Sequence, residues 1–203
     1  RLFEEGHETL VMTGGSMFYI DAVCNGLDNL PDGDAGLRAE LWKRLGEEGV
    51  ETLAEELRSK DPLTYSQIDI RNSQRVIRAL EVCIVSGRPF SSFKTGGRRS
   101  RSFQIEKVGL TSPREELYSR IDRRVLNMMD EGLVEEARSL LPYRNCQALQ
   151  TVGYKEVFEY LDNKIPLEEA VRLIQRNTRH YAKKQLTWWR RDPDIKWIDV
   201  SGR

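Results

Sequence analysis

The sequence has few cysteines, and their placement excludes two classes of protein. Cys24, Cys83 and Cys146 are the only three among 203 residues, and they lie far apart. A disulfide-rich scaffold needs more cysteines, and a metal site needs closer spacing. We expect free core thiols, which fit a reducing cytoplasm.

Long apolar runs are also missing. No apolar segment approaches the roughly 20 residues of a membrane-spanning helix, and no signal peptide opens the chain. The mean hydropathy of -0.58, with 32% charged residues, is typical of a soluble, largely helical protein, so we expect no membrane partner. Arg1 is not an initiator residue, and the chain begins in mid-pattern. We therefore expect it to be cut from a longer protein.

A third absence is local. Residues 175–191 contain no acid, although they carry six Lys or Arg residues, one His and three large aromatics. Helical geometry places one packing face (Ile174, Thr178, Tyr181, Gln185, Trp188) opposite a cationic ridge (Arg172, Arg176, Arg179, Lys183, Arg190). The net charge of the chain is zero, so this ridge is a local feature that suits an extended polyanion. A solvated basic face of an ordinary amphipathic helix is the alternative.

The hydrophobic pattern predicts an α/β protein interrupted by helices. Residues 8–15 predict a buried strand that passes through a glycine turn into a helix starting at Ser16. Residues 25–36, rich in Asp, Asn, Gly and Pro, predict a crossing into a three-helix bundle over residues 37–87. A flexible, basic, solvated loop is expected at 94–101.

The second half of the pattern returns to the sheet. Residues 104–110 predict a strand, and Ser112-Pro113 predicts a capped helix with proline at its first position and acids in its first turn. Further helices are expected at 132–141 and after Pro166, and a last strand at 194–200. The domain boundaries that follow are 1–27 for part of the α/β core, 28–101 for a helical insertion, and 102–203 for the rest of the core with C-terminal helices.

Two short segments are candidates for binding. Arg120, Arg123 and Arg124 share one helical turn and repel one another unless anions lie among them. Glu116 and Asp122 could compensate them, so structural and phosphate-binding roles both stay open. Residues 148–156 surround a glycine with hydrogen-bonding side chains and a tyrosine ring on which a base could stack.

Four blocks strongly resemble the bacterial tRNA dimethylallyltransferases, also called tRNA isopentenyltransferases. They occur in the family order as GGSMFY (14–19), QRVIRALEV (74–82), VGYKE (152–156) and TRHYAKKQLTW (178–188). The resemblance implies an α/β, P-loop NTPase-like parallel-sheet core, incomplete here, with a small helical insertion that binds the anticodon stem-loop. It also implies transfer of a dimethylallyl group from dimethylallyl diphosphate to the exocyclic amine of the adenosine 3′-adjacent to the anticodon. Mg²⁺ is the implied cofactor, and a cytoplasmic monomer is expected.

The resemblance also assigns residues by motif. Arg124, with Arg120 as the alternative, would bind the diphosphate. The implied tRNA contacts are Ser16, Arg38, Gln74, Arg75, Arg78, Leu149, Gln150, Thr151, Val152, Gly153, Tyr154, Lys155, Glu156, Arg179 and Lys183. The family's phosphate loop and its aspartate base belong to a segment preceding Arg1, so the general base is expected outside the chain. No Gly-x-x-x-x-Gly-Lys-Ser/Thr motif occurs in the sequence.

One departure and two alternatives stay open. The family's His-Pro-Asn-Asp run appears here as Asp69-Ile70-Arg71-Asn72, which affects the start of the following helix. A nucleotide phosphotransferase with a helical lid would use the same arginines for ATP phosphates. A non-catalytic RNA-binding fragment would need the basic and aromatic surface alone.

Overall fold

The chain divides into two compact units, one formed by its two ends and the other by its middle. The terminal unit comprises Arg1–Ile20 and Phe103–Arg203, and the middle unit comprises Asp21–Ser102. The computed structural model describes residues 3, 5–94 and 101–202. The predicted insertion, 28–101, lies inside the middle unit. Among the described residues, no helix is long and apolar enough to cross a membrane.

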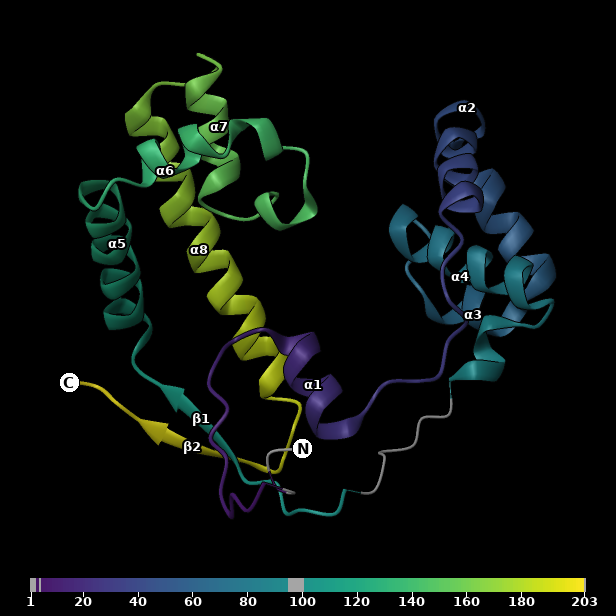
Figure 1. Cartoon of the computed structure of the whole chain (residues 1–203), viewed down its shortest axis with the longest axis horizontal. Coiled ribbons are helices and arrows are strands. Elements are labelled where there is room, and N and C mark those ends of the chain that lie inside the picture. Colours follow the sequence, from purple (N-terminus) through teal and green to yellow (C-terminus); the bar gives the residue numbers. More distant parts are fainter. Residues whose placement is uncertain (1–2, 4, 95–100, 203) are drawn as a thin grey trace. The chain divides into compact units, whose positions relative to one another are not determined.

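The predicted α/β class with a parallel sheet is confirmed, and helices dominate (Figure 1). The α-helices are α1 (Met17–Asn25), α2 (Ala35–Lys60), α3 (Pro62–Gln67), α4 (Ser73–Ser86), α5 (Arg114–Asp130), α6 (Leu133–Ser139), α7 (Tyr154–Leu161) and α8 (Leu167–Trp189). The short 3₁₀ helices are η1 (Phe90–Phe93), η2 (Leu141–Tyr143) and η3 (Gln147–Leu149). The strands are β1 (Lys107–Thr111) and β2 (Ile195–Asp199).

The middle unit is a bundle built on α2 and α4. The helix α2 changes direction at Gly49, whose φ of 84° lies in the left-handed region that glycine adopts without strain. The predicted core stripes of both helices meet, and Leu53, Leu57, Val76 and Leu80 are completely buried. The helical bundle predicted from periodicity is therefore confirmed.

Asp61 joins three elements of this bundle. Its carboxylate accepts hydrogen bonds from the backbone N–H and hydroxyl of Thr64, at 2.9 and 2.6 Å, and so caps α3. It also accepts from the backbone N–H and hydroxyl of Ser91 in η1, at 2.6 and 2.9 Å. Burial raises the pKa of Asp61, but the hydrogen bonds from Thr64 and Ser91 outweigh it, and the pKa lies below the ordinary 3.8.

The terminal unit combines a two-stranded parallel sheet with a helical layer. β1 pairs with β2 from Lys107↔Ile195 to Thr111↔Asp199, and an ion pair of 2.6 Å between Lys107 and Asp192 fixes the start of this register. The helices α5 to α8 share an apolar core of six residues: Val125, Leu133, Ala137, Val157, Phe158 and Ile174. In Figure 1 the long yellow-green helix α8 passes beside α7 and continues toward the end of the unit that holds the strands.

Three local predictions were wrong. Residues 8–15 do not form a buried strand, and Val11 is 85% exposed, because β propensity yields a strand only where a neighbouring strand accepts its hydrogen bonds. Ser112 does not cap α5, since Pro113 occupies the cap position and no side chain bonds the helix start. Arg101 is not merely solvated, because it donates to the carbonyl oxygens of Ala22 and Val23 near the end of α1. Of the predicted loop 94–101, residues 95–100 lie outside the described residues.

We predict that Asp61→Ala lowers the free energy of unfolding of the middle unit by about 2–3 kcal/mol, because four buried or half-buried donors lose their acceptor. Chemical denaturation monitored by circular dichroism measures the loss. The matched control is Asp34→Ala, which removes an exposed cap with a single hydrogen bond to the backbone N–H of Leu37. That variant should lose only about 0.5–1 kcal/mol.

The pH dependence of the same variant gives a second check. The folded pKa of Asp61 lies below its unfolded value, so the stabilisation is complete above pH 3.8 and disappears as the pH falls through the folded pKa. The stability difference between wild type and Asp61→Ala should therefore narrow below that pH. A difference that stays constant on acidification would contradict the assignment of the effect to the ionised carboxylate.

Candidate functional site

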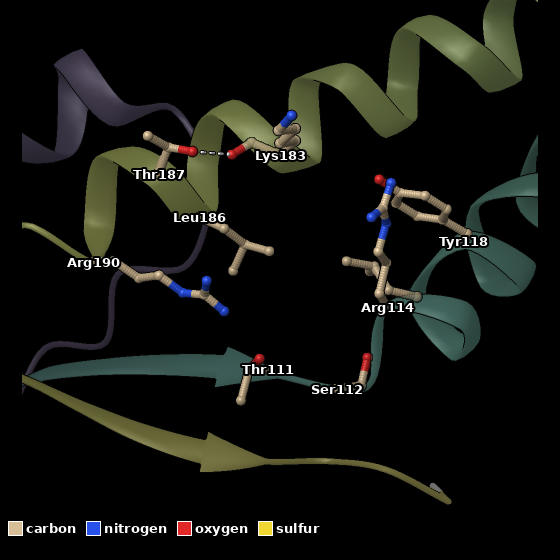
Figure 2. A pocket seen from close by; sticks show the side chains of 9 residues that line it. Thr111, Ser112, Arg114, Tyr118, Lys183, Leu186, Thr187 and Arg190 are labelled. Carbon is tan, nitrogen blue, oxygen red and sulfur yellow. Dashed lines mark hydrogen bonds between the residues drawn. The ribbon is translucent and has the colours of Figure 1, made fainter.

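The terminal unit contains a cationic pocket between the end of β1, the start of α5 and the last turns of α8 (Figure 2). Its volume is about 380 Å³. Its lining comprises Thr111, Ser112, Arg114, Leu117, Tyr118, Lys183, Leu186, Thr187 and Arg190. Three of these side chains carry a positive charge and none carries a negative charge. A pocket with cations, hydroxyls and apolar walls suits an anionic group attached to an apolar or aromatic body.

Residues far apart in sequence form this pocket. Figure 2 shows Arg190 and Leu186 extending from α8 toward the strand end that carries Thr111 and Ser112. The Arg114 guanidinium lies 5.1 Å from the centre of the Tyr118 ring. Lys183 was predicted as a tRNA contact, whereas Arg114, Thr111 and Ser112 were missed. Their only sequence signal is their position at the junction of a strand with a helix.

The cationic ridge of α8 is only partly as predicted. Arg179 forms an ion pair with Asp122 of α5 and also lies 5.8 Å from the centre of the Tyr118 ring. Arg172 pairs with Glu169 at 2.6 Å, one turn earlier on α8. The acid-free segment therefore receives compensation from outside its own limits. Tyr181, placed on the packing face, is 42% exposed. Lys183 and Arg190 remain as the ridge cations that line the pocket.

A second, more open depression of about 400 Å³ follows α5. Arg120, Arg123 and Arg124 line it together with Leu117, Ile121 and Asn127. Asp122 forms its ion pair with Arg179 of α8 and not with any of these three arginines. Among the residues that the structure describes, no carboxylate forms an ion pair with any of the three. Both residues proposed for the diphosphate, Arg124 and Arg120, thus lie on one surface and have no ion-pair partner among the described residues.

The segment predicted as an anticodon-loop contact faces both inward and outward. Leu149 packs on the core, and Gly153 and Glu156 are buried. The Glu156 carboxylate accepts from the Gly153 backbone N–H at 2.8 Å and from the Asn177 side-chain amide at 2.7 Å, which ties α7 to α8. Glu156 is therefore buried and bonded within the protein, which corrects its prediction as a tRNA contact. Its charge had suggested an exposed position.

The outward side chains of this segment are Gln150, Thr151, Val152 and Lys155. Tyr154 is half-buried, and its hydroxyl donates to a Glu136 carboxylate oxygen at 2.7 Å. This hydrogen bond raises the pKa of Tyr154 above its ordinary value. The tyrosine ring is therefore fixed in place rather than free to turn.

The middle unit brings two predicted tRNA contacts together. Arg38 and Arg78 both pair with Glu81 at 2.8 Å, and Glu81 has no exposed side-chain surface. Gln74 and Arg75 lie about one turn before Arg78 on α4, and both are exposed. The role of Glu81 was not predicted from the sequence.

Ser16 is exposed immediately before α1. The neighbouring Gly15 carbonyl oxygen accepts from the Gln185 side-chain amide of α8 at 2.7 Å, which holds the glycine block against that helix. For metals, no group of three or more His, Cys, Asp or Glu residues within 3, 5–94 and 101–202 could hold an ion.

Comparison with known proteins identifies a family. A family model described as IPP transferase matches residues 2–192. The chain is 50% identical over 198 residues to tRNA dimethylallyltransferase 1 of Bacteroides thetaiotaomicron, covering 98% of the chain and 64% of that protein. It is 54% identical over 189 residues to tRNA dimethylallyltransferase 2 of Porphyromonas gingivalis, covering 93% of the chain and 63% of that protein. The chain thus spans less than two thirds of the length of these relatives.

Comparison with solved structures points to the same family of proteins. The full-length tRNA isopentenylpyrophosphate transferase from Bacillus halodurans matches with a TM-score of 0.53 and 40% identity, covering 89% of this chain and 56% of that chain. A eukaryotic dimethylallyltransferase described as acting on tRNA matches with a TM-score of 0.74 and 23% identity, covering 93% and 50%. The second likeness shows a shared fold.

We predict that Glu156→Gln lowers the free energy of unfolding by about 1–3 kcal/mol, because two charge-assisted hydrogen bonds become neutral ones and the Asn177 amide must turn over to accept from the new NH2 group. Thermal or chemical unfolding measures this change. Lys155→Gln, at the exposed neighbouring position, is the control and should leave the stability within about 0.5 kcal/mol of wild type. Equal stabilities of Glu156→Gln and wild type would show that the buried carboxylate does not tie the helices together.

Proposed function

We propose that this chain, which belongs to the IPP transferase family, acts in tRNA modification as a tRNA dimethylallyltransferase. The reaction moves a dimethylallyl group from dimethylallyl diphosphate to the exocyclic amine of the adenosine 3′-adjacent to the anticodon. The family match over residues 2–192, together with relatives of about half identical sequence that carry this name, supports the proposal most strongly.

The proposed chemistry is a substitution at an allylic carbon. The bond between that carbon and the diphosphate oxygen breaks, the bond to the adenine nitrogen forms, and the amine loses a proton to a general base that we place outside the described residues. Negative charge grows on the departing diphosphate. Fixed cations aimed at that charge therefore lower the barrier.

Arg124 is our choice for the diphosphate, with Arg120 as the alternative. Both line the depression on α5, where no carboxylate among the described residues pairs with either. A guanidinium presents paired N–H donors that match phosphate oxygens, which an ammonium group cannot reproduce. We include Mg²⁺ as an ion held chiefly by diphosphate oxygens, since Mg²⁺ that serves phosphates uses few protein ligands.

The tRNA partner is supported by surface chemistry in both units. Lys183 and Arg190 line an acid-free pocket, and Gln150, Thr151 and Lys155 point outward on the predicted anticodon-loop segment. Gln74 and Arg75 are exposed on the middle unit. The target adenine must leave its stack to react, at a cost of a few kcal/mol that is smaller in an unpaired loop. Stacking and phosphate contacts to the open loop would offset this cost.

We predict that Arg124→Ala, made in the complete protein, lowers kcat for prenyl transfer by roughly 10²–10³-fold, as expected when one stabilising donor is lost from a developing negative charge. Transfer of a radiolabelled dimethylallyl group to tRNA at saturating substrates measures this. The matched control is Arg138→Ala, an exposed arginine of α6 outside both cationic surfaces, which should keep normal turnover.

Two results would contradict this assignment. Normal turnover of Arg124→Ala would remove Arg124 from the mechanism, and the same experiment on Arg120→Ala would test the alternative. Tight binding of ATP without prenyl transfer would instead favour a phosphotransferase.

We also predict steep salt dependence of tRNA binding. Replacing Lys183 or Arg190 by Gln should weaken binding and reduce the slope of log K against log salt by about 0.7–0.9 for each phosphate that the protein no longer neutralises. Fluorescence anisotropy with a labelled tRNA at several salt concentrations measures both quantities. Arg138→Gln carries the same change of charge outside the pocket. If it altered the slope as much as the pocket variants, the pocket would have no special role in binding tRNA.

A further inference from the structure

The middle unit contains a carboxylate that is completely buried between two arginines. Glu81 lies on α4, and its Oε1 and Oε2 accept from Nη2 of Arg38 at 2.8 and 3.0 Å. Oε2 also accepts from Nη1 of Arg78 at 2.8 Å. Burial raises the pKa of Glu81, but the hydrogen bonds from Arg78 and Arg38 outweigh it, so the pKa lies below its ordinary value and the carboxylate is ionised at neutral pH.

Stability alone does not explain this arrangement. Glu81 is the one charged residue among the buried residues of α4. The others are apolar: Val76, Ile77, Ala79, Leu80, Val82 and Cys83. A buried ion pair loses about as much hydration free energy as it gains in attraction, and an apolar side chain of similar volume is often equally stabilising. The carboxylate is better explained by the orientation it gives to its partners.

Both partners keep part of their surface free. The side chain of Arg38 is 47% exposed and that of Arg78 is 36% exposed, whereas that of Glu81 is 0% exposed. Each guanidinium has five N–H donors, and Glu81 and the Pro31 carbonyl oxygen occupy only some of them. The remaining donors can bind a ligand, and the triad of Arg38, Arg78 and Glu81 has one positive charge in excess, which favours an anion.

The linker before α2 closes against this cluster. The carbonyl oxygen of Pro31 accepts from Nη2 of Arg78 at 3.3 Å. A Cβ at Gly33 would lie 2.3 Å from Nη2 of Arg38 and 2.9 Å from Oε1 of Glu81. Glycine therefore allows the linker to approach, and a larger residue would force the Arg38 guanidinium out of position.

We propose that Glu81 is a positioning residue that holds Arg38 and Arg78 side by side as a clamp for a backbone phosphate of RNA. This inference rests on the proposed function, because it assumes that the middle unit contacts the tRNA. A phosphate needs converging N–H donors, and two unpaired guanidinium groups would repel each other and separate. The buried carboxylate cancels that repulsion and fixes their spacing.

The clamp and a purely electrostatic surface predict opposite effects of Glu81→Gln on RNA binding, so this variant distinguishes them. Glu81→Gln makes the unit more positive by one charge, so a purely electrostatic surface would bind RNA more tightly. A clamp that has lost its anchor would bind RNA more weakly. Glu51→Gln is the matched control, since it makes the same change of charge at an exposed position of α2 with no ion pair in the described part of the chain.

Binding is measured with the whole chain and a labelled anticodon stem-loop RNA, by anisotropy over a range of salt. We expect Glu81→Gln to raise Kd about 10-fold and to lower the salt slope, and Glu51→Gln to leave Kd unchanged or slightly lower. Gly33→Ala changes no charge but displaces the Arg38 guanidinium from the Glu81 carboxylate, which its Cβ would also crowd, so it should also raise Kd, by several-fold. Circular dichroism confirms folding, and if Glu81→Gln does not fold, Gly33→Ala decides the question.

The outcomes separate the two proposals. If the wild type does not bind the RNA, the proposed function fails. If the wild type binds, but the folded Glu81→Gln or Gly33→Ala variant binds as tightly as it does, the clamp is wrong while the proposed function stands.

Discussion

Mutual repulsion among positive side chains is the constraint on which the candidate surfaces depend. Guanidinium groups that must converge on one anion repel one another without it, so the fold must neutralise some of them and leave others free. Here Asp122 pairs with Arg179, and one buried carboxylate, Glu81, holds both Arg38 and Arg78 while leaving part of each guanidinium exposed. Arg120 and Arg124 have no carboxylate partner among the described residues. The positions of carboxylates thus determine which cations stay free for a ligand.

The same constraint explains how a chain of zero net charge can present cationic surfaces. Part of the acid forms local ion pairs on α2, such as that between Arg44 and Glu48 at 2.8 Å. Exposed pairs of this kind contribute little stability but remove negative charge from the long-range field. The pocket at the end of α8 has no acid in its lining, and its field is therefore felt by an approaching anion.

The sequence predicts the helices well because their core stripes are local. Val76 and Leu80 repeat at helical spacing, and both are buried. The sequence is a poorer guide where the structure of a segment depends on contacts with residues far away in the chain. The apolar segment around Val11 has strand propensity but stays exposed, since pairing is a property of the sheet and not of the segment. The family blocks indicated which segments are candidates for binding, but they did not indicate which side chains of these segments point inward.

Glu156 and Glu81 show why the finer site could not be predicted. Each is a charged residue in a block that resembles an RNA-binding motif, and a sequence pattern cannot distinguish a carboxylate that faces solvent from one that is buried. Both are buried, and both receive bonds from residues outside their own helix, Asn177 and Arg38. Repulsion of RNA phosphates would make an exposed carboxylate unfavourable at these positions. A buried, paired carboxylate instead orders the groups around it, so acids inside a basic motif are compatible with binding a polyanion.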